Sequence, residues 1–177
     1  MSGVVGARAG SVRPARGDDL ATLQDIERDA GSLFATVGMQ SVADDAPLPV
    51  ELLAGYQRGG RAWVSVDDAD VPVGYALALV VDGLGHLEQL SVRPSAGRQG
   101  RGGDLIAAVV AWAQGWGAPA VTLSTFRDVA WNAPYYARHG FVVLADEELS
   151  RGLAELRARE AALGLDVSAR VLMRRPV

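Results

Sequence analysis

The chain has 177 residues, 49% hydrophobic and 21% charged, which is the composition of a soluble globular protein of one-domain size. It contains no cysteine. It also contains no lysine, because all 17 residues counted as lysine or arginine are arginine. The missing cysteine excludes disulfides, thiolate nucleophiles and zinc–thiolate sites. The missing lysine excludes a Schiff-base enzyme and the lysine of a phosphate-binding Walker loop.

The charge and hydropathy patterns exclude further classes of partner. The formal net charge is −4 and no basic run follows a phosphate backbone, so nucleic acid is not expected to bind. Apolar stretches such as 71–81 hold about ten residues, against the roughly twenty of a bilayer span. Residues 1–11 lack the apolar core of a secretion signal. We expect a cytoplasmic protein without a membrane partner, and no metal site, because His86 and His139 stand far apart.

The first third of the chain is predicted to be mainly helical. Residues 1–10 are expected to form a flexible lead-in, and 11–177 a single domain. A strand at 11–16 is followed by a helix at 19–34, a loop at 35–49 and a short helix at 50–58. The first helix buries one face, whose apolar residues recur every three or four positions: Leu20, Leu23, Ile26, Ala30 and Phe34.

The rest of the chain alternates strands and helices. Predicted strands lie at 61–66, 73–81, 85–92, 119–126, 141–144 and 167–173. Predicted helices lie at 105–116, 131–139 and 147–163. This order indicates an α/β or α+β fold with a mixed sheet.

The segment 90–106 is the most distinctive in the sequence. A strand leads through a glycine-rich loop into a helix with an apolar face. Glycine permits positive φ and a close approach of backbone to ligand, and unpaired N–H groups at a helix start attract phosphate oxygens. Gly97, Gly100 and Gly102 do not match the G-x-G-x-x-G dinucleotide spacing. A pyrophosphate cradle of another kind, or a plain flexible turn, is therefore left.

Two motifs resemble the GNAT superfamily of N-acetyltransferases. The run 86–106 is similar to the acetyl-CoA-binding motif R/Q-x-x-G-x-G/A, with Gly100 and Gly102 at its second and third elements. Gly97 stands where the family usually has arginine or glutamine, and Arg98 follows one position later. The run 132–141 resembles the N-x-x-x-Y-x-x-x-G-F segment. The resemblance implies the GNAT fold, a central mixed, mostly antiparallel sheet of six or seven strands flanked by helices.

The resemblance also implies a reaction and a set of binding residues. An acetyl group would move from acetyl-CoA to the primary amine of a small molecule or peptide. The absence of cysteine favours direct transfer in a ternary complex over a cysteine-acyl intermediate. Acetyl-CoA would be held by Leu90, Ser91, Val92, Gly97, Arg98, Gln99, Gly100, Arg101, Gly102, Gly103, Asn132 and Tyr136.

Three residues are candidates for catalysis. The resemblance makes Tyr136 the proton donor to the departing thiolate, since a phenol with a pKa near 10 is protonated at neutral pH. The alternative is that this tyrosine only packs the helix on the sheet, a role that Tyr135 could take instead. His86 and Glu88 share one strand face by period-two alternation, and either could accept the proton of the amine. A base supplied by solvent is left open.

The opposing reading is a non-catalytic acyl-CoA-binding or regulatory module, which the change at Gly97 and the open choice of base allow. Retention of Asn132 and Tyr136 argues against it. The charged helix at 147–163 is expected to be an amphipathic surface helix that covers the acceptor pocket, packs on the sheet or forms a dimer contact. A homodimer is left open as the commonest soluble oligomer.

Overall fold

The computed structural model describes residues 11–177, so the lead-in predicted for 1–10 lies outside the described residues. The helices are α1 (Leu20–Gly31), α2 (Gln40–Ala43), α3 (Val50–Arg58), α4 (Arg101–Gly115), α5 (Ala133–Arg138) and α6 (Arg151–Ala162). The strands are β1 (Val12–Pro14), β2 (Ala62–Val66), β3 (Pro72–Val81), β4 (Leu84–Val92), β5 (Ala120–Phe126), β6 (Val142–Val143) and β7 (Arg170–Pro176).

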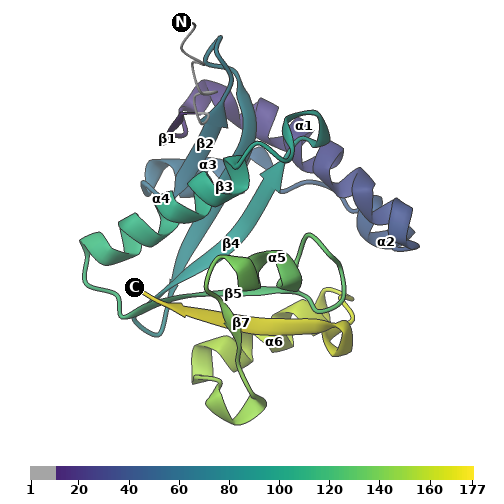
Figure 1. Cartoon of the computed structure of the whole chain (residues 1–177), viewed down its shortest axis with the longest axis vertical. Helices are drawn as coiled ribbons and strands as arrows, with labels where there is room; N and C mark the ends of the chain where they lie inside the picture. Colours follow the sequence, from purple (N-terminus) through teal and green to yellow (C-terminus); the bar gives the residue numbers. More distant parts are fainter. Residues whose placement is uncertain (1–10) are drawn as a thin grey trace, which may run out of the picture. The chain divides into compact units, whose positions relative to one another are not determined.

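The strands form one seven-stranded sheet in the order β1-β2-β3-β4-β5-β7-β6 (Figure 1). β4 and β5 are parallel, whereas β1–β2, β5–β7 and β6–β7 are antiparallel. The fold is therefore α/β, with a mostly antiparallel sheet flanked by helices. The order of predicted elements indicated the mixed α/β class, and the resemblance implied the mostly antiparallel sheet. The final strand, β7, lies between β5 and β6.

The described chain packs as two compact units. The first holds the described residues up to Ala76 and Gln89–Ala108, and the second holds Leu77–Glu88 and Val109–Val177. The elements β3, β4 and α4 run from one unit into the other. The single domain expected for 11–177 stays a prediction.

In the first unit, α1 and α4 cover opposite faces of the sheet. Tyr75 of β3 is fully buried and its hydroxyl donates to Glu27 Oε2 of α1 at 2.9 Å. The preceding residue, Gly74, faces the other way, because strand residues alternate. A Cβ on Gly74 would lie 3.0 Å from Val92 Cγ2 and 3.4 Å from Leu105 Cδ1 of α4. The sheet thus meets α4 closely at Gly74, where a side chain is missing.

In the second unit, α5 and the end of α4 cover one face and α6 covers the other (Figure 1). A Cβ on Gly85 of β4 would lie 3.0 Å from Ala113 Cβ of α4, and Val121 shares this face. Thr125, two alternations further along β5, holds Asn132 at the start of α5. On the opposite face, α6 packs Leu153 and Leu156 against Leu172 of β7. The partly buried residues Val81, Leu144 and Leu149 pack around this cluster.

Several predicted boundaries were wrong for identifiable reasons. The helix predicted at 105–116 begins at Arg101, because Asp104 N–H already donates to Gly100 O and the glycines between them are helical. The helix predicted at 147–163 begins at Arg151, because the Ser150 side chain caps it. The loop predicted at 35–49 contains the one-turn helix α2. The last strand runs from 170 to 176 rather than 167 to 173, since the turn Val167–Ala169 precedes it.

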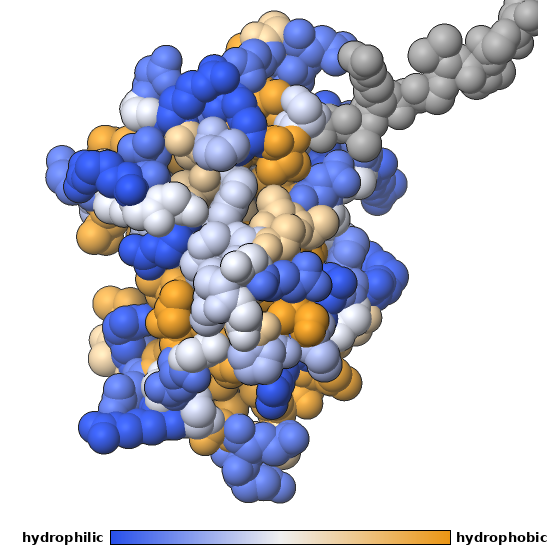
Figure 2. All heavy atoms as spheres, turned by 90° about the vertical axis from the view of Figure 1, so that its left-hand side faces the viewer, coloured by the Kyte–Doolittle hydropathy of each residue, from blue (hydrophilic) through white to orange (hydrophobic). Residues whose placement is uncertain are grey.

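The surface mixes polar and apolar residues. Figure 2 shows one face on which hydrophobic residues are interspersed among hydrophilic ones. Exposed large hydrophobic residues include Val142 and Val143 of β6, and Leu163 at the end of α6. Within 11–177, no helix has both the length and the apolar character needed to cross a membrane.

Candidate functional site

The glycine-rich loop presents backbone N–H groups at the start of α4. Asp104 N–H donates to Gly100 O at 3.0 Å, so the N–H groups of Arg101, Gly102 and Gly103 precede the first hydrogen bond of the helix. N–H groups in this position have no helical acceptor, and the helix dipole adds positive potential there. This end of α4 can therefore bind phosphate oxygens.

Only one of the two loop glycines at 97 and 100 adopts the positive φ that glycine permits. Gly100 has a φ of 77°, in the left-handed region that favours glycine, but Gly97 has a φ of −69°. Arg98, which carries a side chain, adopts a φ of 58°. That conformation is costly for a residue with a Cβ, so the loop holds backbone strain at Arg98.

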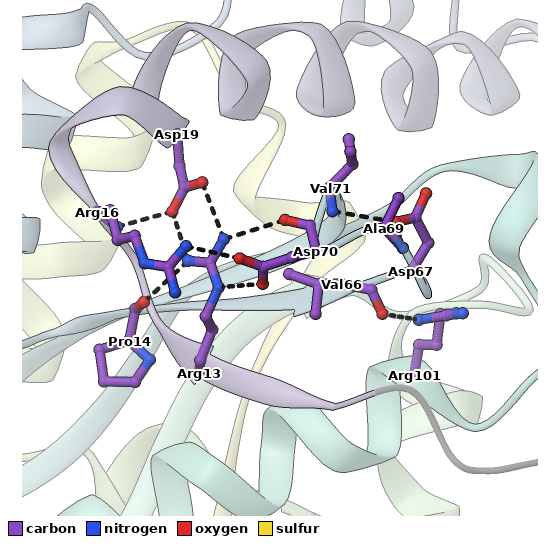
Figure 3. A network of polar contacts seen from close by, with 10 residues as sticks. All are labelled: Arg13, Pro14, Arg16, Asp19, Val66, Asp67, Ala69, Asp70, Val71 and Arg101. Atoms are coloured by element: carbon purple, nitrogen blue, oxygen red, sulfur yellow. Dashed lines mark hydrogen bonds and ion pairs between the residues drawn. The ribbon is translucent and has the colours of Figure 1, made fainter.

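The two arginines predicted to hold acetyl-CoA, Arg98 and Arg101, are placed differently. Arg101 donates from Nη1 to Val66 O of β2 at 2.8 Å (Figure 3). The same Nη1 also donates to Ser65 Oγ at 3.2 Å. Its guanidinium therefore ties the start of α4 to the sheet. Arg98 is exposed, and its side chain makes no hydrogen bond or ion pair within residues 11–177. Of the two, Arg98 is the one whose charge is open to a ligand.

An ion-pair network fixes the strand end that holds Arg101. Arg13 bridges Asp19 and Asp70, with N–O distances of 2.7 Å to each, and Arg16 contacts Asp70 at 2.6 Å (Figure 3). Asp70 belongs to the turn that follows β2, directly after the segment that carries Val66. The network therefore stabilises the end of β2, where Val66 accepts the hydrogen bond from Arg101.

The end of β4 offers a backbone N–H group along its second edge. Arg93 N–H donates to Val73 O of β3 at 2.8 Å. Because neighbouring residues of a strand direct their N–H groups to opposite edges, the N–H of Val92 points away from β3. Pairing on that edge joins 85–87 of β4 to 121–123 of β5, so Val92 lies beyond it. Val92 can therefore offer its backbone N–H to a ligand there, whereas Leu90 and Ser91 stay predicted contacts.

His86 is enclosed in the second unit. Its side chain is 2% exposed, and Nδ1 lies 2.9 Å from Thr122 Oγ1 of β5. Burial, assisted by the charge of Arg159, lowers the pKa of His86 to about 4. The imidazole is therefore neutral at neutral pH, and Nε2 lies 3.7 Å from Glu88 Oε2.

Glu88 reaches the surface where His86 does not. Its side chain is 30% exposed, and it directly follows the last residue of β4 that pairs with β5. Burial raises the pKa of Glu88, Glu160 raises it further, and the charges of Arg159 and Arg170 oppose this rise. A carboxylate with a raised pKa and access to solvent can accept a proton from an external amine.

The second unit also holds Tyr136, on the face opposite to Glu88. Burial raises the pKa of Tyr136 above its usual 10, so the phenol is protonated. Its ring meets Phe141 edge to face, with 6.0 Å between centroids. Tyr135 packs instead on His139, 4.7 Å away, and under Arg138. The packing role considered for Tyr136 is thus shared with its neighbour.

Asn132 is fixed at the start of α5. Its Oδ1 accepts a hydrogen bond from Thr125 Oγ1 at 2.7 Å, and its backbone carbonyl accepts from Tyr136 N–H at 3.0 Å. Asn132 and Tyr136, the first two specified residues of the N-x-x-x-Y-x-x-x-G-F segment, are therefore joined through one helical turn.

Sequence reasoning missed the polar cluster that surrounds Glu88 on the α6 face. Its members are Thr122, Ser124, Arg159, Glu160 and Arg170. A signal was present only in β5, where Thr122 and Ser124 interrupt a buried apolar strand at period two. Within the described chain, no group of three or more histidine or acidic residues is arranged to hold a metal ion.

Comparison with solved structures identifies proteins of the same fold. A Mycobacterium tuberculosis protein in complex with CoA has a TM-score of 0.70 and 18% identity, over 94% of this chain and 99% of that chain. PaiA N-acetyltransferase from Thermoplasma acidophilum, also in complex with coenzyme A, has a TM-score of 0.66 and 13% identity, over 94% and 98%.

N-acetylglutamate synthase from Neisseria gonorrhoeae, complexed with coenzyme A and N-acetyl-glutamate, has a TM-score of 0.71 and 18% identity. The match covers 94% of this chain and 34% of that longer chain. At such identities the likeness establishes the fold. The sequence profile of the acetyltransferase (GNAT) family matches residues 23–141, more than half of the chain. The chain therefore belongs to the GNAT family of acetyltransferases, enzymes that transfer an acyl group from acyl-CoA.

Proposed function

We propose that this acetyltransferase moves the acetyl group of acetyl-CoA directly to the primary amine of a small molecule or peptide. The observation that carries the proposal is the position of Glu88, a half-buried carboxylate placed where the β4–β5 pairing ends. Tyr136 lies on the opposite face of the same unit. A base and an acid are thus available on the two sides of one strand pair.

The cradle residues fit the phosphates of acetyl-CoA. The N–H groups of Arg101, Gly102 and Gly103 would bind phosphate oxygens, and Arg98 would add a charge-assisted contact. At Gly100, where even a Cβ would meet nothing within 4 Å, the backbone is open to a ligand. Leu90 and Val92 would contact the pantetheine arm, with the Val92 N–H polarising the thioester carbonyl. Ser91, Gly97, Gln99 and Asn132 remain predicted contacts.

Acetyl-CoA supplies the activated thioester, and the protein moves two protons. Glu88 accepts a proton from the ammonium group of the acceptor, which frees the nitrogen lone pair to form the N–C bond. As the C–S bond breaks, the Tyr136 hydroxyl donates a proton to sulfur. The acylated nitrogen loses its second proton through solvent to the tyrosinate, so Tyr136 returns to its protonated form and the amide is neutral. His86 acts as a positioning residue, because it is buried between Thr122 and Glu88.

Calorimetric titration with acetyl-CoA, compared with NADH and ATP, tests the cradle. Selective binding of acetyl-CoA supports the proposal, and its absence in a folded sample contradicts it. Gly102→Val is expected to abolish binding while the protein still melts cooperatively. The matched control is Gly115→Val at the other end of α4, where a Cβ would meet nothing within 4 Å.

A second assay tests the chemistry. Release of CoA in the presence of amines can be followed with a thiol reagent, without background, because the chain has no cysteine. Tight binding of acetyl-CoA without release from any amine would instead favour the non-catalytic acyl-CoA-binding module.

A further inference from the structure

Helix α6 forms a fixed wall on the Glu88 face of the second unit. At its start, Gly152 N–H donates to Asp82 Oδ2 at 2.7 Å, in the turn between β3 and β4. At its end, Glu160 contacts Arg170 of β7. Buried leucines pack the middle of the helix against the sheet. The backbone of α6 is therefore held in a fixed position on the Glu88 face.

Glu160 and Arg170 form an ion pair in which each side chain neutralises the charge of the other. Arg170 donates from Nη2 to Glu160 Oε1 at 3.1 Å and from Nε to Oε2 at 3.3 Å, in the two-pronged geometry that suits guanidinium and carboxylate. Their side chains are only 13% and 15% exposed. Ser124 donates to Glu160 at 2.9 Å, and Arg170 lies over the Phe126 ring, 4.7 Å from its centroid. Neither charge is left for a substrate.

Arg159, the neighbouring residue, is in the opposite situation. It is exposed, and within residues 11–177 no carboxylate lies within 4.0 Å of its guanidinium nitrogens. It stands seven positions after Gly152, and therefore on the side of α6 that faces the β3–β4 turn. Its charge acts on both His86 and Glu88 of β4.

Once the Glu160–Arg170 pair is set aside, Arg159 and Glu88 are a cation and an anion on this face that no arginine–carboxylate ion pair engages within 11–177. Arg174 of β7 is a further exposed arginine on this face, but it lies beside β6, where it pairs with Val142. We propose that Arg159 binds the carboxylate of the acceptor while Glu88 receives its ammonium group, so that the acceptor is a free amino acid. Arginine suits this role because its planar fork matches a carboxylate. An acceptor with a second cation in place of the carboxylate would meet Arg159 unfavourably. The inference rests on the proposed function, in which Glu88 is the base.

Kinetics with matched acceptors test the inference. The probes are the twenty L-amino acids and their carboxamides, which keep the amine but lose the carboxylate charge, at saturating acetyl-CoA. We expect the wild type to prefer at least one free acid over its amide by about tenfold or more in kcat/KM. Arg159→Gln should raise KM for that acid by about tenfold or more while KM for the amide changes less than about twofold.

Two further variants separate a binding role from a structural one. Arg159→Lys should restore part of the preference for the acid, because it keeps the charge and loses the fork. Arg151→Gln removes the same charge from the far, exposed end of α6 and should leave both KM values unchanged. KM for acetyl-CoA should be the same in all four proteins.

The failures are distinguishable. Turnover of amines with no preference for any free acid, or an equal loss for acid and amide in Arg159→Gln, would overturn the inference and leave the proposed function standing. A folded wild type that neither binds acetyl-CoA nor releases CoA would overturn both.

Discussion

At Glu88, partial burial and the activity of the enzyme are linked through pH. Because burial raises the pKa of this carboxyl, Glu88 takes up its proton at a higher pH than an exposed glutamate does. We expect kcat/KM to fall as pH decreases through that pKa, since the protonated acid cannot accept a proton. Glu88→Gln should lower kcat/KM by about hundredfold or more and remove this acidic limb.

The pH–rate profile is the measurement, with Glu155→Gln as a control because Glu155 is exposed on the surface of α6. If the Glu88→Gln enzyme kept the wild-type pH–rate profile, Glu88 would not be the base, and solvent would accept the proton of the amine.

Tyr136 is expected to matter for turnover and not for affinity. Tyr136→Phe removes only the hydroxyl, so we expect kcat to fall at least about tenfold, or about 1.4 kcal/mol in the barrier, with the Kd for acetyl-CoA unchanged. Because the pKa of Tyr136 lies above 10, its deprotonation should not limit the rate at moderately alkaline pH. Tyr135→Phe is the matched control and should keep kcat within about twofold. Single-turnover rates test this role. Equal rates in wild type and Tyr136→Phe would show that Tyr136 is not the proton donor to the thiolate.

His86 should make the fold sensitive to acid. Its pKa is about 4 in the folded chain and about 6.5 when unfolded, so the unfolded chain binds the proton more readily. Stability from His86 is therefore complete above pH 6.5 and is lost as pH falls toward 4, by roughly 3 kcal/mol at most. Urea unfolding at several pH values measures this slope. His86→Gln should flatten it, whereas His139→Gln, at a more exposed site, should keep most of it.

At the level of single elements, the start of α6 depends on one missing side chain. A Cβ on Gly152 would lie 2.8 Å from both carboxylate oxygens of Asp82 and from Val81 Cγ1. Gly152→Ala should therefore push the helix away from the β3–β4 turn and cost about 1–3 kcal/mol of unfolding free energy. Gly55→Ala in α3, where a Cβ would meet nothing within 4 Å, should be neutral or stabilising. Chemical denaturation compares the two, and equal effects would refute the steric account.

Local signals explain how far the elements could be predicted. The helix predicted at 50–58 matches α3 at both ends, because Pro49 and Gly59 mark its limits. The start of α4 was misjudged, because glycines at 102 and 103 suggest a loop although their backbone is helical. Period-two spacing placed His86 and Glu88 on one face, where they lie 3.7 Å apart. Arg159, Glu160 and Arg170 could not be found this way, because their partners on β4 and β5 are distant in sequence.

For the whole molecule, the elements shared by the two compact units determine how cooperatively the protein unfolds. Three elements, β3, β4 and α4, pass from one compact unit to the other. Breaking such an element in one unit removes hydrogen bonds of the same strand or helix in the other. We expect one thermal transition, with equal calorimetric and van't Hoff enthalpies. Scanning calorimetry tests this, and two resolved transitions would contradict both this expectation and the single domain predicted from the sequence.

The place of β7 has a consequence for the order of events during synthesis. β6 joins the sheet only through β7, yet Val143 leaves the ribosome well before Arg170 does. At roughly 5–20 residues per second, the nascent chain waits on the order of seconds with the backbone of β6 unpaired and the buried leucines of α6 still without Leu172. During that interval the growing polypeptide exposes apolar side chains of the kind that chaperones shield.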